Sequence, residues 1–168
     1  MSKIAKPVTI EVLCGQEIFQ YYNEIAHVRC ETFVLWPYLC LLDYEKEKIY
    51  LKEIANKSDA ICVVAISGEA VVGAILGMPL ADVCNDAIKC TLATLVPVAT
   101  TYYIDGIAVL PRFQKKGHSK AMLNALEKEV SKKEYFESIV LSEVARAGSH
   151  PKRPKKERSL YRFWDDRG

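Results

Sequence analysis

No stretch of this sequence is long and apolar enough to cross a bilayer. The longest uncharged run, which contains residues 91–104, has a proline and six threonines or tyrosines, whereas a membrane-spanning helix needs about 20 largely apolar residues. The first residues also lack an apolar signal-peptide core followed by a cleavage site of small residues. We therefore expect a cytoplasmic protein without a membrane partner.

The sequence also lacks the cysteine and histidine spacings of metal sites. Its six cysteines form no Cys-x-x-Cys pair and match no zinc motif, and there are only three histidines. Cys30, Cys40 and Cys62 lie in apolar surroundings. We interpret the cysteines as buried, reduced thiols that act as small hydrophobic side chains, and we expect no metal ion.

There is little excess charge of either sign. The net charge is only +2 at pH 7, which gives no general attraction to nucleic acid or to a membrane surface. The 168 residues are 50% hydrophobic and 26% charged, as in a soluble globular protein with a proper core. We expect a single domain over residues 1–168.

What the sequence does contain is a series of strand and helix patterns. Strands are predicted over residues 7–13, 59–67, 70–80, 100–109 and 136–144. Helices are predicted over residues 18–33, 43–58, 117–130 and 158–168, the second with Asp43 as its N-cap. Gly68 and Glu69 are predicted to form a hairpin turn, and residues 81–99 a long loop. The order β-α-α-β-β-β-α-β-α predicts an α/β domain with a mixed sheet.

A short cationic turn joins the strand at 100–109 to the helix that follows. The first N–H groups of a helix lack partners inside it and attract anions, phosphate above all. Gly117 lets the backbone approach a ligand closely, and Ser119 is too small to block it. Lys115 and Lys116 add positive charge. We therefore expect this turn to bind a phosphorylated cofactor.

The same residues resemble a known motif. Val109-x-Pro111-x-x-Gln114-x-x-Gly117-x-Ser119 is similar to the acetyl-CoA-binding motif of the GNAT acetyltransferases, with Ser119 in place of the usual Gly or Ala. Three other stretches, "RCETFVLWPYL", "YYIDG" and "HPKRP", are similar to one uncharacterised subgroup of that family. The resemblance implies a mostly antiparallel central sheet flanked by helices, and transfer of an acetyl group from acetyl-CoA to an amine.

The resemblance also implies where the coenzyme lies. The main-chain amides of the turn would hold its pyrophosphate, and the preceding strand would bind its pantetheine arm. The residues implied at the pyrophosphate are Gln114, Lys115, Lys116, Gly117, His118, Ser119 and Lys120. Those implied along the pantetheine are Ile107, Ala108 and Val109.

The catalytic candidates are less sharply defined. Asp105 lies four residues before Val109, on the same face of the strand if alternation holds, where it would hold or deprotonate the acceptor amine. A strand-edge aspartate that bonds a loop is the alternative. Glu143 on the next strand is a second candidate for that role, or a solvated strand end.

Proton donation to the leaving thiolate is usually the role of a tyrosine on the last helix of this family. Trp164 stands at that position here, so Tyr161, one helical turn earlier, is the substitute candidate, or a core residue. Tyr102 and Tyr103 are further candidates, although aromatic strand residues mostly serve packing. His150 lies in a polar loop where it would touch substrate or the phosphate of the coenzyme.

Arg29 and the corner at residues 36–39 resemble the acceptor-side wall of relatives. The family fold continues with two more strands beyond the position of Gly168, so we expect either a fragment or a naturally short protein. In a naturally short protein the strand at 136–144 would be an exposed edge, which predicts either a homodimer through that edge or reduced activity.

Three functions are compatible with these features of the sequence. The first is an N-acetyltransferase that acts on a small-molecule or peptide amine in a ternary complex with acetyl-CoA. The second is a non-catalytic protein that binds coenzyme A as a sensor or scaffold. The third is a nucleic-acid-binding module that uses the basic run 152–158, which the low net charge and the lack of aromatic residues among the basic ones disfavour. We expect no nucleic-acid partner.

Overall fold

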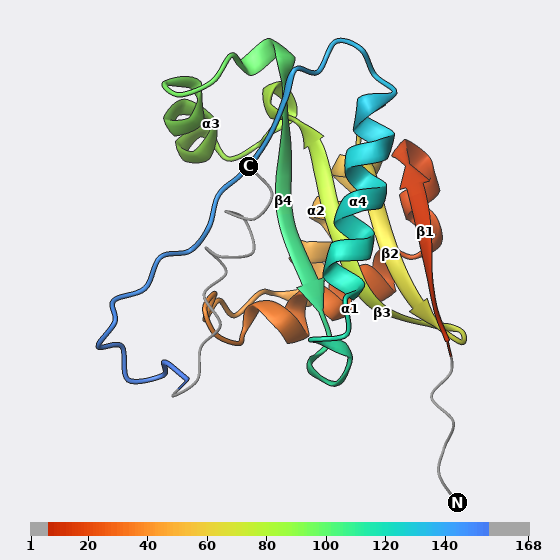
Figure 1. Ribbon diagram of the computed structural model, residues 1–168, viewed down its shortest axis with the longest axis vertical. Helices are drawn as coiled ribbons and strands as arrows, with labels where there is room; N and C mark the ends of the chain where they lie inside the picture. The colour runs from red at the N-terminus through yellow and green to blue at the C-terminus, as the bar shows by residue number, and fades with distance from the viewer. Residues whose placement is uncertain (1–6, 155–168) are drawn as a thin grey trace, which may run out of the picture.

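A five-stranded sheet forms the centre of the protein (Figure 1). The computed structural model describes residues 7–154. Its strands are β1 (Val8–Cys14), β2 (Ile61–Ser67), β3 (Ala70–Pro79), β4 (Thr101–Val109) and β5 (Ser138–Leu141). They lie in the order β1-β2-β3-β4-β5, so each strand pairs with its neighbour in sequence. The first four are antiparallel, and β5 runs parallel to β4.

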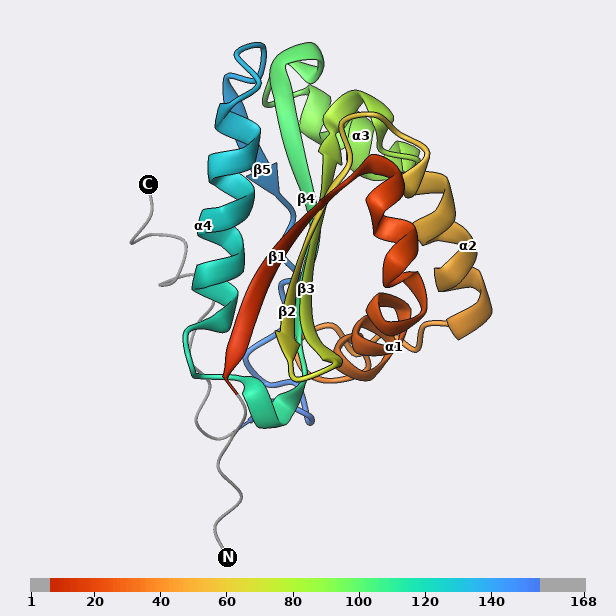
Figure 2. The ribbon, with the colours of Figure 1, turned by 90° about the vertical axis from the view of Figure 1, so that its right-hand side faces the viewer.

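Helices cover both faces of the sheet (Figure 2). Helices α1 (Tyr22–Phe33) and α2 (Tyr44–Ala55) lie on one face, and α4 (His118–Ser131) lies on the other. Because β4 and β5 are parallel, the chain needs a crossover between them, and α4 is that crossover. The predicted mixed sheet flanked by helices is confirmed.

Local sequence signals set most of the element ends. The Asp43 side chain accepts a hydrogen bond from the Lys46 amide at 3.0 Å, so it is the N-cap of α2 as predicted. Gly68 has φ of +67° in the β2–β3 turn, a conformation that favours glycine. Apolar side chains then fill both layers, with Ile25 and Leu51 fully buried on one face of the sheet and Leu126 on the other.

Strand β4 contains one extra residue, a β-bulge. The register pairs Leu76 with Gly106 and the next residue, Gly77, with Ile104, which leaves Asp105 without a partner on β3. A bulge places two consecutive side chains on one side of the sheet. Asp105 and Gly106 accordingly both face α1. A Cβ at Gly106 would lie 2.8 Å from Cζ of Phe33 on α1, and the Asp105 side chain bonds Arg29 of the same helix.

The bulge also coincides with the end of the β4–β5 ladder. The last pair is Ile104 with Leu141, whereas β4 continues to Val109. The bulged strand bends at this point, and β5 stops. Within residues 7–154, the edge of β4 from 105 to 109 therefore has no strand on the β5 side.

Two predicted elements differ from the structure, and a third is not tested by it. Residues 81–99 are not one long loop, because they contain a helix, α3 (Asp86–Ala93), which the side chain of Asn85 caps. Helix α3 has only eight residues and none of them is fully buried, so the apolar pattern made by Ile88 and Leu92, which pack partly against the core, is short. The predicted strand 136–144 is shorter, as β5 covers only Ser138–Leu141. The predicted helix 158–168 lies outside the described residues.

We predict that Gly106→Ala lowers the free energy of unfolding by about 1–3 kcal/mol, as overpacking of a close contact usually does. The added methyl group would press on the Phe33 ring where β4 meets α1. Urea denaturation measures the change. Gly148→Ala is the control, because a Cβ there meets only the end of the Arg153 side chain. Equal stability of the two variants would contradict the close approach.

Candidate active site

The turn before α4 has an unusual backbone. Pro111–Phe113 form a short 3-10 helix, and then Lys115 and Gly117 adopt positive φ angles of +61° and +83°. The Gln114 side chain donates a hydrogen bond of 2.8 Å to the carbonyl of Val109 and so closes the turn onto the end of β4. Gly117 is the N-cap of α4, and within residues 7–154 no side chain caps this helix start.

This turn concentrates positive charge. Lys115, Lys116 and Lys120 are exposed around the start of α4. Arg112 and Lys116 both lie over the ring of Phe113, at 5.1 and 5.4 Å from its centroid. The turn therefore offers helix-start amides, the positive end of a helix dipole and several cations to an anion. The residues predicted to bind the pyrophosphate, 114–120, thus all lie around the start of α4.

The strand that leads to this turn does not alternate as predicted. Ile104 is paired with Gly77, and a Cβ at Gly77 would meet Leu126 of α4. Val109 is paired with Gly73, where a Cβ would meet Met122 of α4. Ile104 and Val109 thus both face α4 although they are five positions apart in sequence, which only a bulge between them permits.

The prediction that Asp105 shares a face with Val109 is therefore wrong. Asp105 points to the opposite face, toward α1 and α2, because the bulge interrupts the alternation. The edge of β4 at Ile107, Ala108 and Val109 lies between the Asp105 bulge and the Gly117 turn. Ala108 and Val109 are buried and Ile107 is half-buried.

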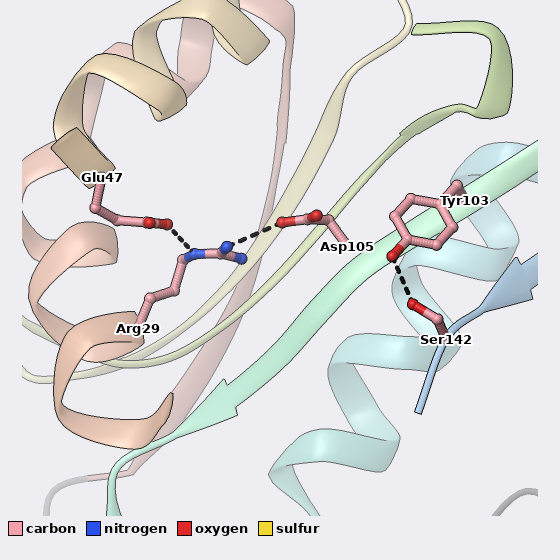
Figure 3. A network of polar contacts seen from close by, with 5 residues as sticks. All are labelled: Arg29, Glu47, Tyr103, Asp105 and Ser142. Atoms are coloured by element: carbon pink, nitrogen blue, oxygen red, sulfur yellow. Dashed lines mark hydrogen bonds and ion pairs between the residues drawn. The ribbon is translucent and has the colours of Figure 1, made fainter. Parts of the chain in front are cut away.

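Asp105 is the end of a chain of ion pairs (Figure 3). The Arg29 guanidinium of α1 donates from Nη2 to Oδ2 of Asp105 at 2.9 Å, and from Nε to Oε1 of Glu47 on α2. The side chains of Arg29 and Glu47 are 7% and 8% exposed and that of Asp105 is 16% exposed, so Asp105 is the member nearest to solvent. Burial alone lowers the pKa of a guanidinium, but the two carboxylates outweigh it and raise the pKa of Arg29.

Three tyrosines lie close to Asp105. Burial raises the pKa of Tyr50, and Asp105 raises it further through its charge and a side-chain hydrogen bond. Burial also raises the pKa of Tyr38 and of Tyr103. At neutral pH all three phenols therefore remain protonated and can act as hydrogen-bond donors.

Glu143 and its neighbours approach the same region from the segment after β5. The hydroxyl groups of Tyr103 and Ser142 are 2.8 Å apart and hydrogen-bonded (Figure 3). Glu143 is exposed, and its charge raises the pKa of Tyr38 after the larger effect of burial. The structure thus brings Glu143, Tyr38 and Asp105 to one side of β4. Tyr161 lies outside the described residues.

The loop after Glu143 is fastened to the corner between α1 and α2. Arg146 donates from Nε to the carbonyl of Pro37 at 3.0 Å and from Nη2 to that of Tyr38. The rings of Trp36 and His150 lie 5.3 Å apart. This loop and the corner therefore form one wall beside Asp105, and an acceptor-side position for residues 36–39 stays a prediction.

Sequence reasoning missed the partners of Arg29. Glu47 and Tyr50 were not singled out, because nothing in the sequence links positions 29, 47 and 105. One signal was present: Ile25, Arg29 and Phe33 recur every four residues, so Arg29 lies on the buried stripe of its helix. An arginine at such a position indicates a buried acidic partner.

A comparison with known families matches residues 22–152 to the profile described as the acetyltransferase (GNAT) family. The chain belongs to the GNAT acetyltransferase family. The match covers the four described helices, the strands from β2 onward and the Gly117 turn. No curated protein matches the chain.

Solved structures share the fold of this GNAT acetyltransferase at low sequence identity. The aminoglycoside N-acetyltransferase AAC(6')-Iy in complex with CoA has a TM-score of 0.60 at 14% identity, over 86% of this chain and 82% of that chain. The same enzyme with a bisubstrate analogue, CoA-S-monomethyl-acetylneamine, has a TM-score of 0.61 at 15% identity, over 96% and 89%. Ribosomal-protein-alanine N-acetyltransferase from Brucella melitensis biovar Abortus 2308 has a TM-score of 0.52 at 16% identity, over 80% and 79%.

The described residues contain neither a metal-binding cluster nor a membrane-spanning helix. Among residues 7–154 of this GNAT acetyltransferase, no group of three or more His, Cys, Asp or Glu side chains is arranged to hold a metal ion. Within the same residues, none of the helices has both the length and the apolar character needed to cross a membrane.

The cysteines differ in environment. All six are free thiols. The expectation that they are buried holds for Cys62 but is wrong for Cys40, Cys84 and Cys90, which are exposed. Cys40 lies in an apolar stretch of sequence, but it follows the corner at residues 36–39, where its side chain faces solvent.

We predict that Cys62 resists alkylation by iodoacetamide at pH 8 while the exposed cysteines react. Burial raises the pKa of Cys62 to about 12 and also blocks access to its sulfur. Mass spectrometry of peptides before and after denaturation in guanidinium measures the labelling. Rapid modification of Cys62 in the folded protein would contradict its place in the core.

Proposed function

We propose that this protein transfers an acetyl group from acetyl-CoA to a primary amine by direct attack of the amine in a ternary complex. The observation that carries the proposal is the arrangement of β4. The edge of β4 that has no neighbouring strand runs from the bulge at Asp105 to Val109, and the cationic turn at Gly117 follows directly. One extended ligand with an anionic end can follow this path.

Coenzyme A has the chemistry that this path requires. We propose that its pyrophosphate lies at the amides of residues 114–120, where Lys115, Lys116 and Lys120 add charge. Its pantetheine arm would bond main-chain groups that face away from β3 along the segment of Ile107, Ala108 and Val109, as an added strand does, although the Val109 carbonyl already accepts a hydrogen bond from Gln114. The family membership and the structural neighbours with bound coenzyme support this assignment.

In this pose the thioester reaches the bulge, beside the carboxylate of Asp105. The acceptor would approach from the side of α1 and α2, where Tyr38 and Tyr103 supply hydrogen-bond donors. Aligning the amine with the thioester carbonyl removes most of the entropic cost of the reaction. The ammonium ion first gives one proton to Glu143 or water, because only a neutral nitrogen has a lone pair for the attack. The nitrogen then forms a bond to the carbonyl carbon, the C–S bond breaks, and the second proton lost by nitrogen ends on sulfur, so the coenzyme leaves as its thiol.

Asp105 is better suited to hold the amine than to act as a strong base. One of its oxygens already accepts a hydrogen bond from the Arg29 guanidinium, and Tyr50 also bonds this carboxylate. We therefore propose that Asp105 anchors the acceptor ammonium ion, and that Glu143 or water receives the proton. Tyr161 remains our candidate for proton donation to the thiolate.

The acceptor is proposed as a small-molecule or peptide amine. Structural neighbours are named for an aminoglycoside and for a ribosomal-protein alanine, and both are acceptors with amino groups. The wall made by residues 36–39 and the loop at 145–154 would shape the acceptor pocket.

We predict release of free thiol from acetyl-CoA by the wild-type protein with at least one member of a panel of aminoglycosides, polyamines and peptides with free N-terminal amines. A thiol-reactive dye measures the release. Asp105→Asn should lower kcat/KM for the amine at least tenfold, because the ammonium ion loses its counter-charge, and leave KM for acetyl-CoA within threefold. Thermal stabilisation by coenzyme A without turnover on any amine would support the non-catalytic alternative.

We further predict that Gly117→Glu weakens binding of coenzyme A at least tenfold, as measured by calorimetry. The glutamate would place negative charge beside the pyrophosphate and strain a backbone with φ of +83°. Gly68→Glu is the matched control, since Gly68 is exposed, has φ of +67° and lies in the β2–β3 turn. Equal affinity of the two variants would place the nucleotide elsewhere.

A further inference from the structure

The ion-pair chain of Glu47, Arg29 and Asp105 joins three elements that are far apart in sequence. Glu47 comes from α2, Arg29 from α1 and Asp105 from the bulge of β4 (Figure 3). The chain contains two carboxylates for one guanidinium, so it carries one more negative than positive charge. The most exposed carboxylate is the one at the bulge.

Arg29 is held so that it has little freedom to move. Its Nε and Nη2 groups bond the two carboxylates. Its guanidinium also lies 4.9 Å from the centroid of the Phe33 ring and 5.9 Å from that of Tyr50. A planar guanidinium fixed on several sides fixes in turn the carboxylate that it bonds.

The stability of the fold does not require these buried ion pairs. Burial of charges costs free energy that ion pairing often fails to recover, and apolar side chains of similar volume often stabilise a protein as well or better. The Gly106 position lets β4 come close enough to Arg29 and Phe33 for the pair to form. A costly charge chain that ends at a partly exposed carboxylate in a strand bulge is typical of a binding or catalytic site.

We propose that Arg29 is a positioning residue for the acceptor: it fixes the Asp105 carboxylate so that the remaining acceptor capacity of that carboxylate binds the substrate ammonium ion. Asp105 then touches the substrate, and Arg29 and Glu47 act through it. The surplus negative charge of the chain favours a protonated amine over a neutral nucleophile. This inference rests on the proposed acetyl transfer and names the charge state in which the acceptor binds.

The test compares Arg29→Met with the wild type on two kinds of acceptor. One is the best amine of the panel, which is an ammonium ion at pH 7, and the other is a hydrazide, which is neutral at that pH. For the amine, Arg29→Met should raise KM at least tenfold, with the dissociation constant of coenzyme A within threefold of the wild type. For the hydrazide, KM should change less than threefold, because no charge needs to be held.

Two further variants control for misfolding, and they distinguish a loss of stability from a loss of the fixed position of Asp105. Arg29→Lys keeps a buried cation but cannot bond both carboxylates, so it should raise KM for the amine by about three- to tenfold. Lys133→Met is the control, since Lys133 forms an ion pair with Asp59, more exposed than the pairs of Arg29, between the end of α4 and the start of β2. It should lower thermal stability without changing either KM.

Each outcome decides between distinct conclusions. No turnover by the wild type on any acceptor overturns the proposed function and this inference with it. Wild-type turnover together with an unchanged amine KM in Arg29→Met overturns the inference alone. If Arg29→Met does not fold, an unchanged amine KM in Arg29→Lys overturns it equally. An equal rise of KM for the amine and the hydrazide would assign Arg29 a purely structural role.

Discussion

The extra residue in β4 at Asp105 is the constraint on which the rest of the site depends. It reverses the alternation of side chains along the strand, so Asp105 faces α1 and α2 while Val109 faces α4. It also coincides with the last pair of β4 with β5. One inserted residue thus provides both a free strand edge and a carboxylate beside it.

The bulge is stabilised from the side of the helices. Gly106 leaves room for the Phe33 ring, and Arg29 reaches the carboxylate of Asp105 from the same helix. The backbone irregularity and the buried charge therefore depend on each other. Without the guanidinium the carboxylate would be buried without its counter-charge, and without the bulge Asp105 and Val109 would lie on the same face of β4.

The two halves of the proposed site are built in different ways. The half proposed for the coenzyme lies in one continuous segment, from Ile107 to Lys120, and is held by local contacts such as the bond from Gln114 to the carbonyl of Val109. The half proposed for the acceptor draws on α1, α2, β4 and the loop after β5. Substrate specificity in such an arrangement depends on how four segments pack, whereas coenzyme binding depends mainly on one turn.

The sequence by itself determined the elements whose signals are local. The cap at Asp43, the turn at Gly68 and the helix start at Gly117 each depend on a few adjacent residues, and so all three were predicted. Helix α3 was missed because it is only eight residues long and its apolar residues, Ile88 and Leu92, are only partly buried, so its apolar pattern is short. The position of the bulge and the partners of Arg29 are determined only by the tertiary structure. The bulge is a matter of register against β3, and the ion pairs join residues up to 76 positions apart, which no pattern along the chain records.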